Sequence, residues 1–148
     1  MPKTGKHGRS QRSAARPKCL QTAFKLTEKK FNWSFRCAFW KHDGWKPCND
    51  PCFFVEHIIE KLRQLEKQIW QEVLDASGGK AVGHGNNNHF IAANQLPRIE
   101  RKAFIKEGYM DLYDKVFSLR LSGTERLIGV VNMNCFEILW FDPSHTFF

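Results

Sequence analysis

The side chains best suited to chemistry in this 148-residue chain lie near its C-terminal end. Arg120 and Arg126 stand on either side of the stretch SGTE, and His145 follows an Asp-Pro pair close to the last residue. An arginine is permanently charged, and its planar guanidinium group can bind two phosphate oxygens together. A histidine can donate or accept a proton near neutral pH. These residue types are suited to holding a phosphate group and to moving a proton beside it.

Each of these assignments has an alternative that the residues leave open. Arg120 and Arg126 are also typical of solvated side chains beside a turn, since charged residues are common at exposed strand ends. The two guanidinium groups share one face of a sheet only in some hairpin registers, and a four-residue turn leaves the register open. His145 can equally be a polar residue after an Asp-Pro-Ser turn, in which Asp142 organises the backbone rather than acting as a base.

The C-terminal third is predicted to position these residues on a three-stranded meander. The segments KVFSLRL, RLIGVV and CFEILWF have the composition of strands. They are separated by SGTE and NMN, and connections this short force antiparallel neighbours, because a parallel crossover needs about a dozen residues or more. The sequence therefore predicts antiparallel strands over residues 115–121, 126–131 and 135–141.

Another strand is predicted close to the N-terminus. In KKFNWSFRCAF, apolar side chains occupy every second position: Phe31, Trp33, Phe35, Cys37 and Phe39. A period of two predicts one strand over residues 31–39 with these five side chains on one face. Residues 41–50, with their Asp-Gly and Lys-Pro pairs, are predicted to form a loop.

Helices are predicted between this strand and the meander. Asp50 and Pro51 begin the first helix, because Asp accepts unpaired backbone N–H groups and Pro fits the first turn. Its apolar stripe recurs at three- and four-residue steps: Val55, Ile58, Ile59, Leu62, Leu65, Ile69 and Val73. The stripe predicts a long core-facing helix that breaks before IWQEVLDA, which forms a second, short one.

A Gly- and Asn-rich surface loop is predicted over residues 76–95, with His84 and His89 as polar loop residues. Pro97 then begins another helical segment, and Gly108 ends it. The predicted fold class is α+β: one N-terminal strand, a long helix and shorter helices, packed on a C-terminal three-stranded antiparallel meander.

The positive charge is concentrated at the N-terminus. Residues 1–30 hold nine of the 23 basic side chains and one of the 15 acidic ones, so residues 31–148 hold 14 of each. This pattern predicts a basic, disordered arm over residues 1–30 and a single domain over residues 31–148. The arm is expected to bind nucleic-acid phosphates through Lys3, Lys6, Arg9, Arg12, Arg16 and Lys18.

Cysteine content and hydropathy argue against a secreted protein, a metal-binding protein and a membrane protein. The five cysteines are an odd number in a chain with no secretory leader, which indicates reduced thiols and a cytoplasmic protein. Cys48 and Cys52 lie near His42 and His57, but the Asp-Pro pair between the cysteines suits a helix start better, so we predict no metal and no cofactor. No apolar run reaches the roughly 18 residues of a membrane helix, and no membrane partner is expected.

The order of elements resembles the RelE/ParE-like toxin superfamily, and most of all its ribosome-associated mRNA interferases of the YoeB and RelE type. ERLIGVV is similar to the family's central strand, which begins with a functional arginine, here Arg126. NMN is similar to its tight polar turn. CFEILWFDPSHTFF is similar to its last strand, after which the family often places a His or Tyr, here His145. The tyrosine that often accompanies the histidine is absent, with Phe147 and Phe148 in its place.

This resemblance covers about 115 residues in topology and about 30 in motif, and it implies RNA cleavage without a metal. In that reaction the ribose 2′-hydroxyl loses a proton as it attacks the phosphate, and the leaving 5′-oxygen gains one. Arg126 would clamp the phosphate, with Arg120 beside it, and His145 would be the general acid. The general base stays unassigned. The implied protein is an endoribonuclease toxin of a type II toxin–antitoxin system, acting on RNA or ribosome-bound mRNA and inhibited by a cognate antitoxin.

Two other functions are compatible with the same residues. The first is a non-enzymatic binding module on the RelE/ParE-like fold, either directed at gyrase or an inert mobile-element protein. The formally neutral domain, the absent tyrosine and the unassigned base favour it. The second is a nucleic-acid-binding protein that acts through its basic arm alone.

Overall fold

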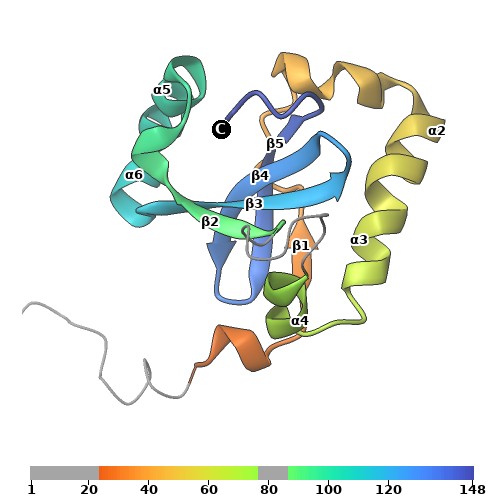
Figure 1. The fold of residues 1–148 in the computed structure, drawn as a ribbon. Helices are drawn as coiled ribbons and strands as arrows, with labels where there is room; N and C mark the ends of the chain where they lie inside the picture. The colour runs from red at the N-terminus through yellow and green to blue at the C-terminus, as the bar shows by residue number, and fades with distance from the viewer. Residues whose placement is uncertain (1–23, 77–86) are drawn as a thin grey trace, which may run out of the picture.

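Five strands form one mixed sheet in the order β1-β5-β4-β3-β2 (Figure 1). The structure is a computed structural model, and it describes residues 24–76 and 87–148. The strands are β1 (Asn32–Ser34), β2 (His89–Ala92), β3 (Lys115–Ser122), β4 (Glu125–Asn132) and β5 (Cys135–Asp142). The last three form the predicted antiparallel meander, β2 extends it antiparallel to β3, and β1 pairs in parallel with β5.

Helices cover both faces of this sheet, with α2 to α4 on one side and α5 and α6 on the other (Figure 1). The α-helices are α2 (Pro51–Phe54), α3 (Glu60–Leu65), α4 (Trp70–Asp75), α5 (Arg98–Lys106) and α6 (Tyr109–Leu112). The other helical segments are the π-helix η3 (Val55–Ile59) and the 3-10 turns η1 (Leu26–Glu28), η2 (Asp43–Asn49) and η4 (Ala93–Gln95). The predicted α+β class is therefore confirmed. No helix within the described ranges is long and apolar enough to cross a membrane.

Two apolar clusters hold the layers together. Ile58, Leu62 and Trp70 are fully buried against the sheet face that carries Leu127. On the opposite face, the second cluster is centred on buried aromatic and aliphatic side chains of α5, β4, β5 and the C-terminal tail: Phe104, Ile128, Trp140 and Phe147. Alternate residues of the central strands thus serve different cores, as expected for a sheet covered on both faces.

The long helix begins where the sequence predicts. The side chain of Asp50 accepts a 3.0 Å hydrogen bond from the backbone N–H of Cys52, and Pro51 is the first helical residue. The helix is regular α at its ends and π in the middle, over η3. Successive side chains of a π turn are rotated about the helix axis by a smaller angle than those of an α turn, which shifts the buried stripe. Val55, predicted in that stripe, is 45% exposed.

The first strand is shorter than the predicted 31–39. The backbone N–H of Ala38 donates to the carbonyl of Phe35 at 3.0 Å, and this turn ends the extended run. The first three alternating side chains pack in the cluster under α2–α4, whereas Cys37 and Phe39 pack in the cluster under α5. The prediction of one shared face was wrong, because the turn carries the chain past the sheet edge to the other side.

Part of the predicted loop 76–95 is a strand. β2 pairs with the first half of β3, and η4 follows it directly. The Asn-rich composition hid this strand, because four residues on a sheet edge carry little periodicity of their own. Residues 77–86, including His84, lie outside the described part of the chain. Neither η2 nor α6 was predicted.

The described part of the chain begins at residue 24, before the predicted start of the domain at residue 31. The backbone N–H of Trp70 donates to the carbonyl of Lys29 at 2.8 Å, and Leu26 packs against the first apolar cluster. Residues 24–30 are thus packed against α4. The six basic residues predicted to bind nucleic acid, Lys3, Lys6, Arg9, Arg12, Arg16 and Lys18, all lie outside the described residues.

Candidate functional site

The hairpin register brings the two arginines together. Arg120 on β3 is the direct partner of Arg126 on β4, and directly opposed residues of an antiparallel pair project from the same face. Arg126 alternates with Ile128 and Val130, which belong to the second apolar cluster, so both arginines project from the face that α5 covers. The register that the turn left open therefore places the two arginines next to each other on one face of the sheet.

The Arg126 guanidinium makes hydrogen bonds within its own hairpin. Its Nη1 donates to the carbonyl oxygens of Gly123 at 2.9 Å and of Glu125 at 3.0 Å, and the residue is only 9% exposed. Burial and then the charge of Arg120 lower the pKa of this guanidinium, while Asp142 opposes the shift. The side chain is thus a buried cation that braces the β3–β4 turn.

Arg120 is held by the segment before β2. Its Nη1 donates to Oδ1 of Asn87 at 2.7 Å, and its backbone N–H donates to Oδ1 of Asn88 at 2.9 Å. Asn88 is buried and also donates to the carbonyl of Val73 at 2.8 Å. The position of Arg120 is therefore set by side chains far from it in the sequence.

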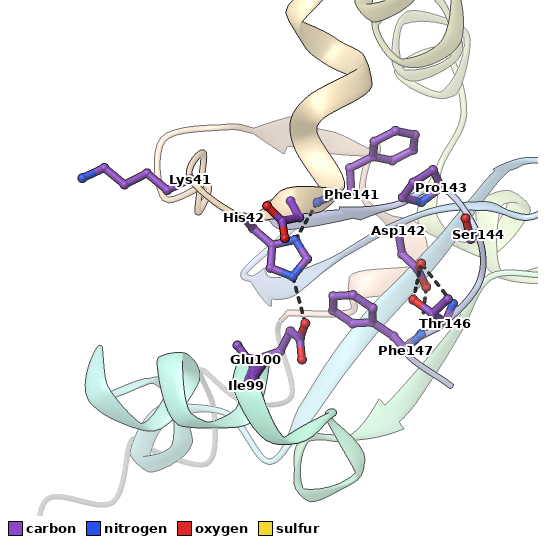
Figure 2. Close-up of a pocket in the computed structure, with 12 residues that line it drawn as sticks. Lys41, His42, Ile99, Glu100, Phe141, Asp142, Pro143, Ser144, Thr146 and Phe147 are labelled. Atoms are coloured by element: carbon purple, nitrogen blue, oxygen red, sulfur yellow. Dashed lines mark hydrogen bonds and ion pairs between the residues drawn. The ribbon is translucent and has the colours of Figure 1, made fainter.

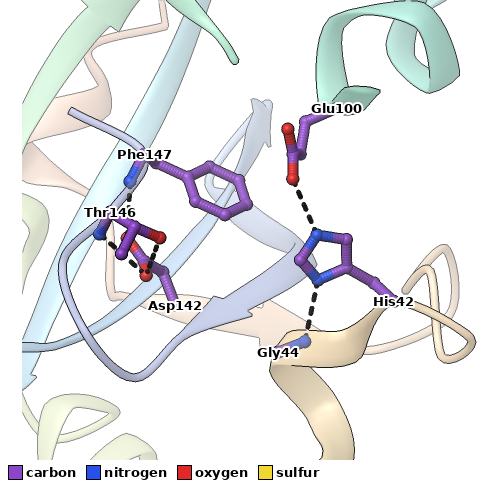
Figure 3. A network of polar contacts seen from close by, with 6 residues as sticks. All are labelled: His42, Gly44, Glu100, Asp142, Thr146 and Phe147. Atoms are coloured by element: carbon purple, nitrogen blue, oxygen red, sulfur yellow. Dashed lines mark hydrogen bonds and ion pairs between the residues drawn. The ribbon is translucent and has the colours of Figure 1, made fainter. Parts of the chain in front are cut away.

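Asp142 organises the C-terminal tail, as predicted. Its Oδ1 accepts from both the backbone N–H and the hydroxyl of Thr146, each at 3.0 Å, and its Oδ2 accepts from the backbone N–H of Phe147 at 2.9 Å (Figure 3). The residue is 2% exposed. Because both oxygens accept hydrogen bonds from the tail, this carboxylate shapes the turn that carries His145.

His145 lies on the outside of that turn. It is exposed, and its backbone φ of 55° is in the left-handed region that few non-glycine residues adopt. The Thr124 hydroxyl donates to the carbonyl of Pro143 at 2.7 Å, which ties the tail to the β3–β4 turn. Residues 122–126 and 142–146 therefore meet, and we call this region the hairpin–tail corner. Arg126 and His145 each lie two residues beyond the Thr124–Pro143 bond.

A pocket of about 520 Å³ opens beside the corner, between the tail, the start of η2 and the start of α5 (Figure 2). Its wall includes Ser144 and Thr146 but not His145, so the imidazole does not line it. Across the pocket from Asp142, Nε2 of His42 lies 2.8 Å from Oε1 of Glu100. At the hairpin–tail corner His145 is therefore exposed on the surface, and a separate pocket lies on the η2 side.

Both ring nitrogens of His42 are used. The backbone N–H of Gly44 donates to Nδ1 at 3.0 Å, so in the neutral ring the hydrogen is on Nε2 and is donated to Glu100 (Figure 3). A Cβ at Gly44 would overlap the carbonyl oxygen of Phe141, so glycine allows η2 to lie directly on β5. Sequence reasoning missed this pair, because its two residues are 58 positions apart.

A second His–Glu pair joins His57 of η3 to Glu125 at the hairpin–tail corner. Sequence reasoning considered His57 only as a neighbour of the Cys48–Cys52 pair. Burial, and then the charge of Glu125, raise the pKa of the Cys48 thiol to about 11, so this cysteine is protonated at neutral pH. In the residues that the structure describes, no three His, Cys, Asp or Glu side chains gather closely enough to hold a metal ion.

Comparisons of this chain with protein-family models, with curated proteins and with solved structures found no match.

Proposed function

We propose that this protein is a metal-independent endoribonuclease that cuts RNA at the hairpin–tail corner, as a toxin of the RelE/ParE-like kind would. The observation that supports the proposal is the direct pairing of Arg120 with Arg126 on one face, next to the tail that carries His145. Two guanidinium groups that repel each other gain from an anion held between them. A phosphodiester is such an anion, and its charge grows during cleavage.

The roles follow from the chemistry of each group. Arg126 and Arg120 bind the phosphoryl oxygens as the ribose 2′-oxygen attacks phosphorus. His145, exposed on its turn, gives a proton to the leaving 5′-oxygen. In this proposal the substrate is RNA or ribosome-bound mRNA, and a cognate antitoxin, encoded separately, would keep the activity in check.

The test is cleavage of a labelled RNA by purified protein, with and without ribosomes and in the presence of a metal chelator. We expect cleavage by the native protein and a loss of roughly 10²-fold or more in Arg126→Lys, which keeps the charge but not the two-oxygen geometry. His145→Ala should lose a similar factor, as expected for a missing general acid. Lys102→Ala, an exposed change on α5, is the control. No cleavage by the native protein, or full activity in both site variants, would reject the proposal.

The N-terminal arm is tested separately by deleting residues 1–23, which leaves every described residue in place. We propose that the arm adds phosphate contacts, so the shortened protein should bind RNA more weakly and with a shallower dependence on salt. Its cleavage of saturating RNA should stay close to that of the full chain. Loss of all activity would instead favour a nucleic-acid-binding protein that works through the arm alone.

A non-enzymatic binding module is the second candidate, and one observation favours it. The Arg126 guanidinium already donates to two backbone carbonyls and is almost fully buried, which is typical of a structural arginine. In this case the corner would hold a protein partner, such as gyrase for the related gyrase-directed toxins, or would be inert. Purified protein that binds a partner but leaves RNA intact, with and without ribosomes, would support this function.

A further inference from the structure

Two pockets meet at the first turn of α5. Ile99 and Glu100 line the pocket of about 520 Å³ beside the hairpin–tail corner, and both residues also line a second pocket of about 580 Å³. The second pocket is formed by the beginning of α5 and by Pro97 before it. Because the two pockets share part of their walls, they form one continuous groove, and we call it the α5 groove.

The α5 groove offers apolar surface to a ligand. Ile99, which both pockets share, is 75% exposed, the largest exposed fraction among the large apolar side chains of the described residues. Pro97 lines one pocket, and Pro143 and Phe147 line the other. An exposed apolar side chain inside a groove is stabilised when an apolar group of another molecule covers it.

The carboxylates in the walls already have partners. Asp142 accepts three hydrogen bonds from the tail. Oε1 of Glu100 lies 2.8 Å from Nε2 of His42. Oδ1 of Asp43 lies 3.0 Å from Nζ of Lys46. These carboxylates therefore maintain contacts within the protein.

The cations at the rim of the α5 groove differ in this respect. Within residues 24–76 and 87–148, neither Lys41 nor Arg98 takes part in a hydrogen bond or an ion pair. Both are exposed, and Figure 2 shows the Lys41 side chain extending away from the other lining residues. Arg98 is the first residue of α5, where the helix dipole disfavours a positive charge, so stabilisation of the helix does not account for it.

The helix that carries Arg98 is basic as a whole. α5 contains four basic side chains, all exposed, and one carboxylate, that of Glu100. This distribution attracts a ligand that brings negative charge.

The lining favours a protein over a nucleic acid as the source of that charge. Bases of single-stranded RNA bind by stacking on exposed aromatic faces. The two phenylalanine rings in the walls, Phe141 and Phe147, are 0% and 6% exposed, so neither offers a free face to a base. An apolar side chain between carboxylates matches both the exposed isoleucine and the cations beside it.

We propose that the α5 groove binds a protein partner through an acidic segment whose central apolar side chain packs on Ile99. The carboxylates of the segment reach Lys41 on one side and Arg98 on the other. Ser144 and Thr146 also line the groove, so the bound segment lies against the C-terminal tail. This interaction goes beyond the proposed RNA cleavage and takes place whether or not the protein cuts RNA.

The test is a titration of the isotope-labelled full chain with a synthetic peptide in which one leucine stands between two pairs of glutamates. Amide chemical shifts in the NMR spectrum report both the affinity and the location of binding. We expect saturable shifts at Ile99, Glu100, Ser144 and Thr146, and an affinity that falls as salt is added. A peptide with serine in place of leucine should bind roughly tenfold more weakly or worse, and so should one with lysines in place of the glutamates.

Two variants and a matched control locate the interaction. Ile99→Glu should weaken binding roughly tenfold or more, because it replaces the apolar contact by a repelling carboxylate. Arg98→Glu should also weaken binding and should make it less dependent on salt. Ile105→Glu is the control, since Ile105 lies on the same helix, is 54% exposed and lines neither pocket. Its affinity should equal that of the native protein.

Three results would overturn the inference. The first is the absence of saturable shifts, and the second is native affinity in Ile99→Glu. The third is displacement of the peptide by a single-stranded RNA oligonucleotide that shifts the same amides, which would make the groove a nucleic-acid site. None of these binding experiments depends on RNA cleavage, so the proposed function is judged separately by the cleavage assay.

Discussion

Two histidine–glutamate pairs lie on opposite sides of the last strands, and they differ in how far their side chains are buried. In the pair of His42 and Glu100, the side chains are 21% and 12% exposed, and Nδ1 of the ring also accepts from the backbone N–H of Gly44. In the pair of His57 and Glu125, the His57 side chain is 40% exposed and its ring stacks on Phe53. The same two residue types therefore form a buried contact in one place and a more exposed contact in the other.

The largest effect should come from the more buried pair, His42 and Glu100. His42→Ala removes the acceptor for Gly44 and leaves Glu100, whose side chain is 12% exposed, without its partner. We expect a loss of about 1–3 kcal/mol in the free energy of unfolding, the usual cost of unsatisfied buried polar groups. Urea unfolding at neutral pH measures it. An unchanged midpoint would mean that water replaces the imidazole without cost.

The pKa of the Cys48 thiol responds to burial and to the negative charge of Glu125. Its pKa rises from 9.0 to about 11 in the folded state, first through burial and then through Glu125. The folded state thus favours the protonated thiol, so this stability is fully present below about pH 9 and is lost as the pH rises toward 11. After solvent screening the loss is on the order of 1 kcal/mol. Above about pH 9 the melting temperature of the native protein should therefore fall more steeply with pH than that of Cys48→Ala, and parallel curves would contradict the burial of this thiol.

The smallest effect should come from the more exposed pair. In His57→Gln the amide can still donate to Glu125, and the lost imidazole is 40% exposed. We expect the free energy of unfolding to stay within about 0.5 kcal/mol of the native value, as for most surface substitutions. Urea unfolding measures it, with His89→Asn on the exposed strand β2 as the histidine control. A loss as large as that of His42→Ala would remove the contrast between the two pairs.

The elements that the sequence predicted correctly are those set by interactions between residues close together in the chain. The helix start at Asp50 and Pro51 is confirmed, because a side-chain cap and a proline act on adjacent residues. The meander is confirmed, because three- and four-residue connections allow only antiparallel neighbours. The alternation over residues 31–39 led to the wrong prediction of one long strand with a single apolar face. A period of two cannot reveal a turn that moves the chain to the other face of a sheet.

The sequence by itself thus determined the α+β class, the order of the main elements and the turn that Asp142 organises. Only the tertiary structure decided that Arg120 stands opposite Arg126, because the register depends on which faces of both strands are buried. It alone decided the partners of His42 and His57, which lie 58 and 68 positions away in the chain. Periodicity and capping act over a few residues, whereas the tautomer of a histidine depends on whichever donor or acceptor the folded chain places beside it.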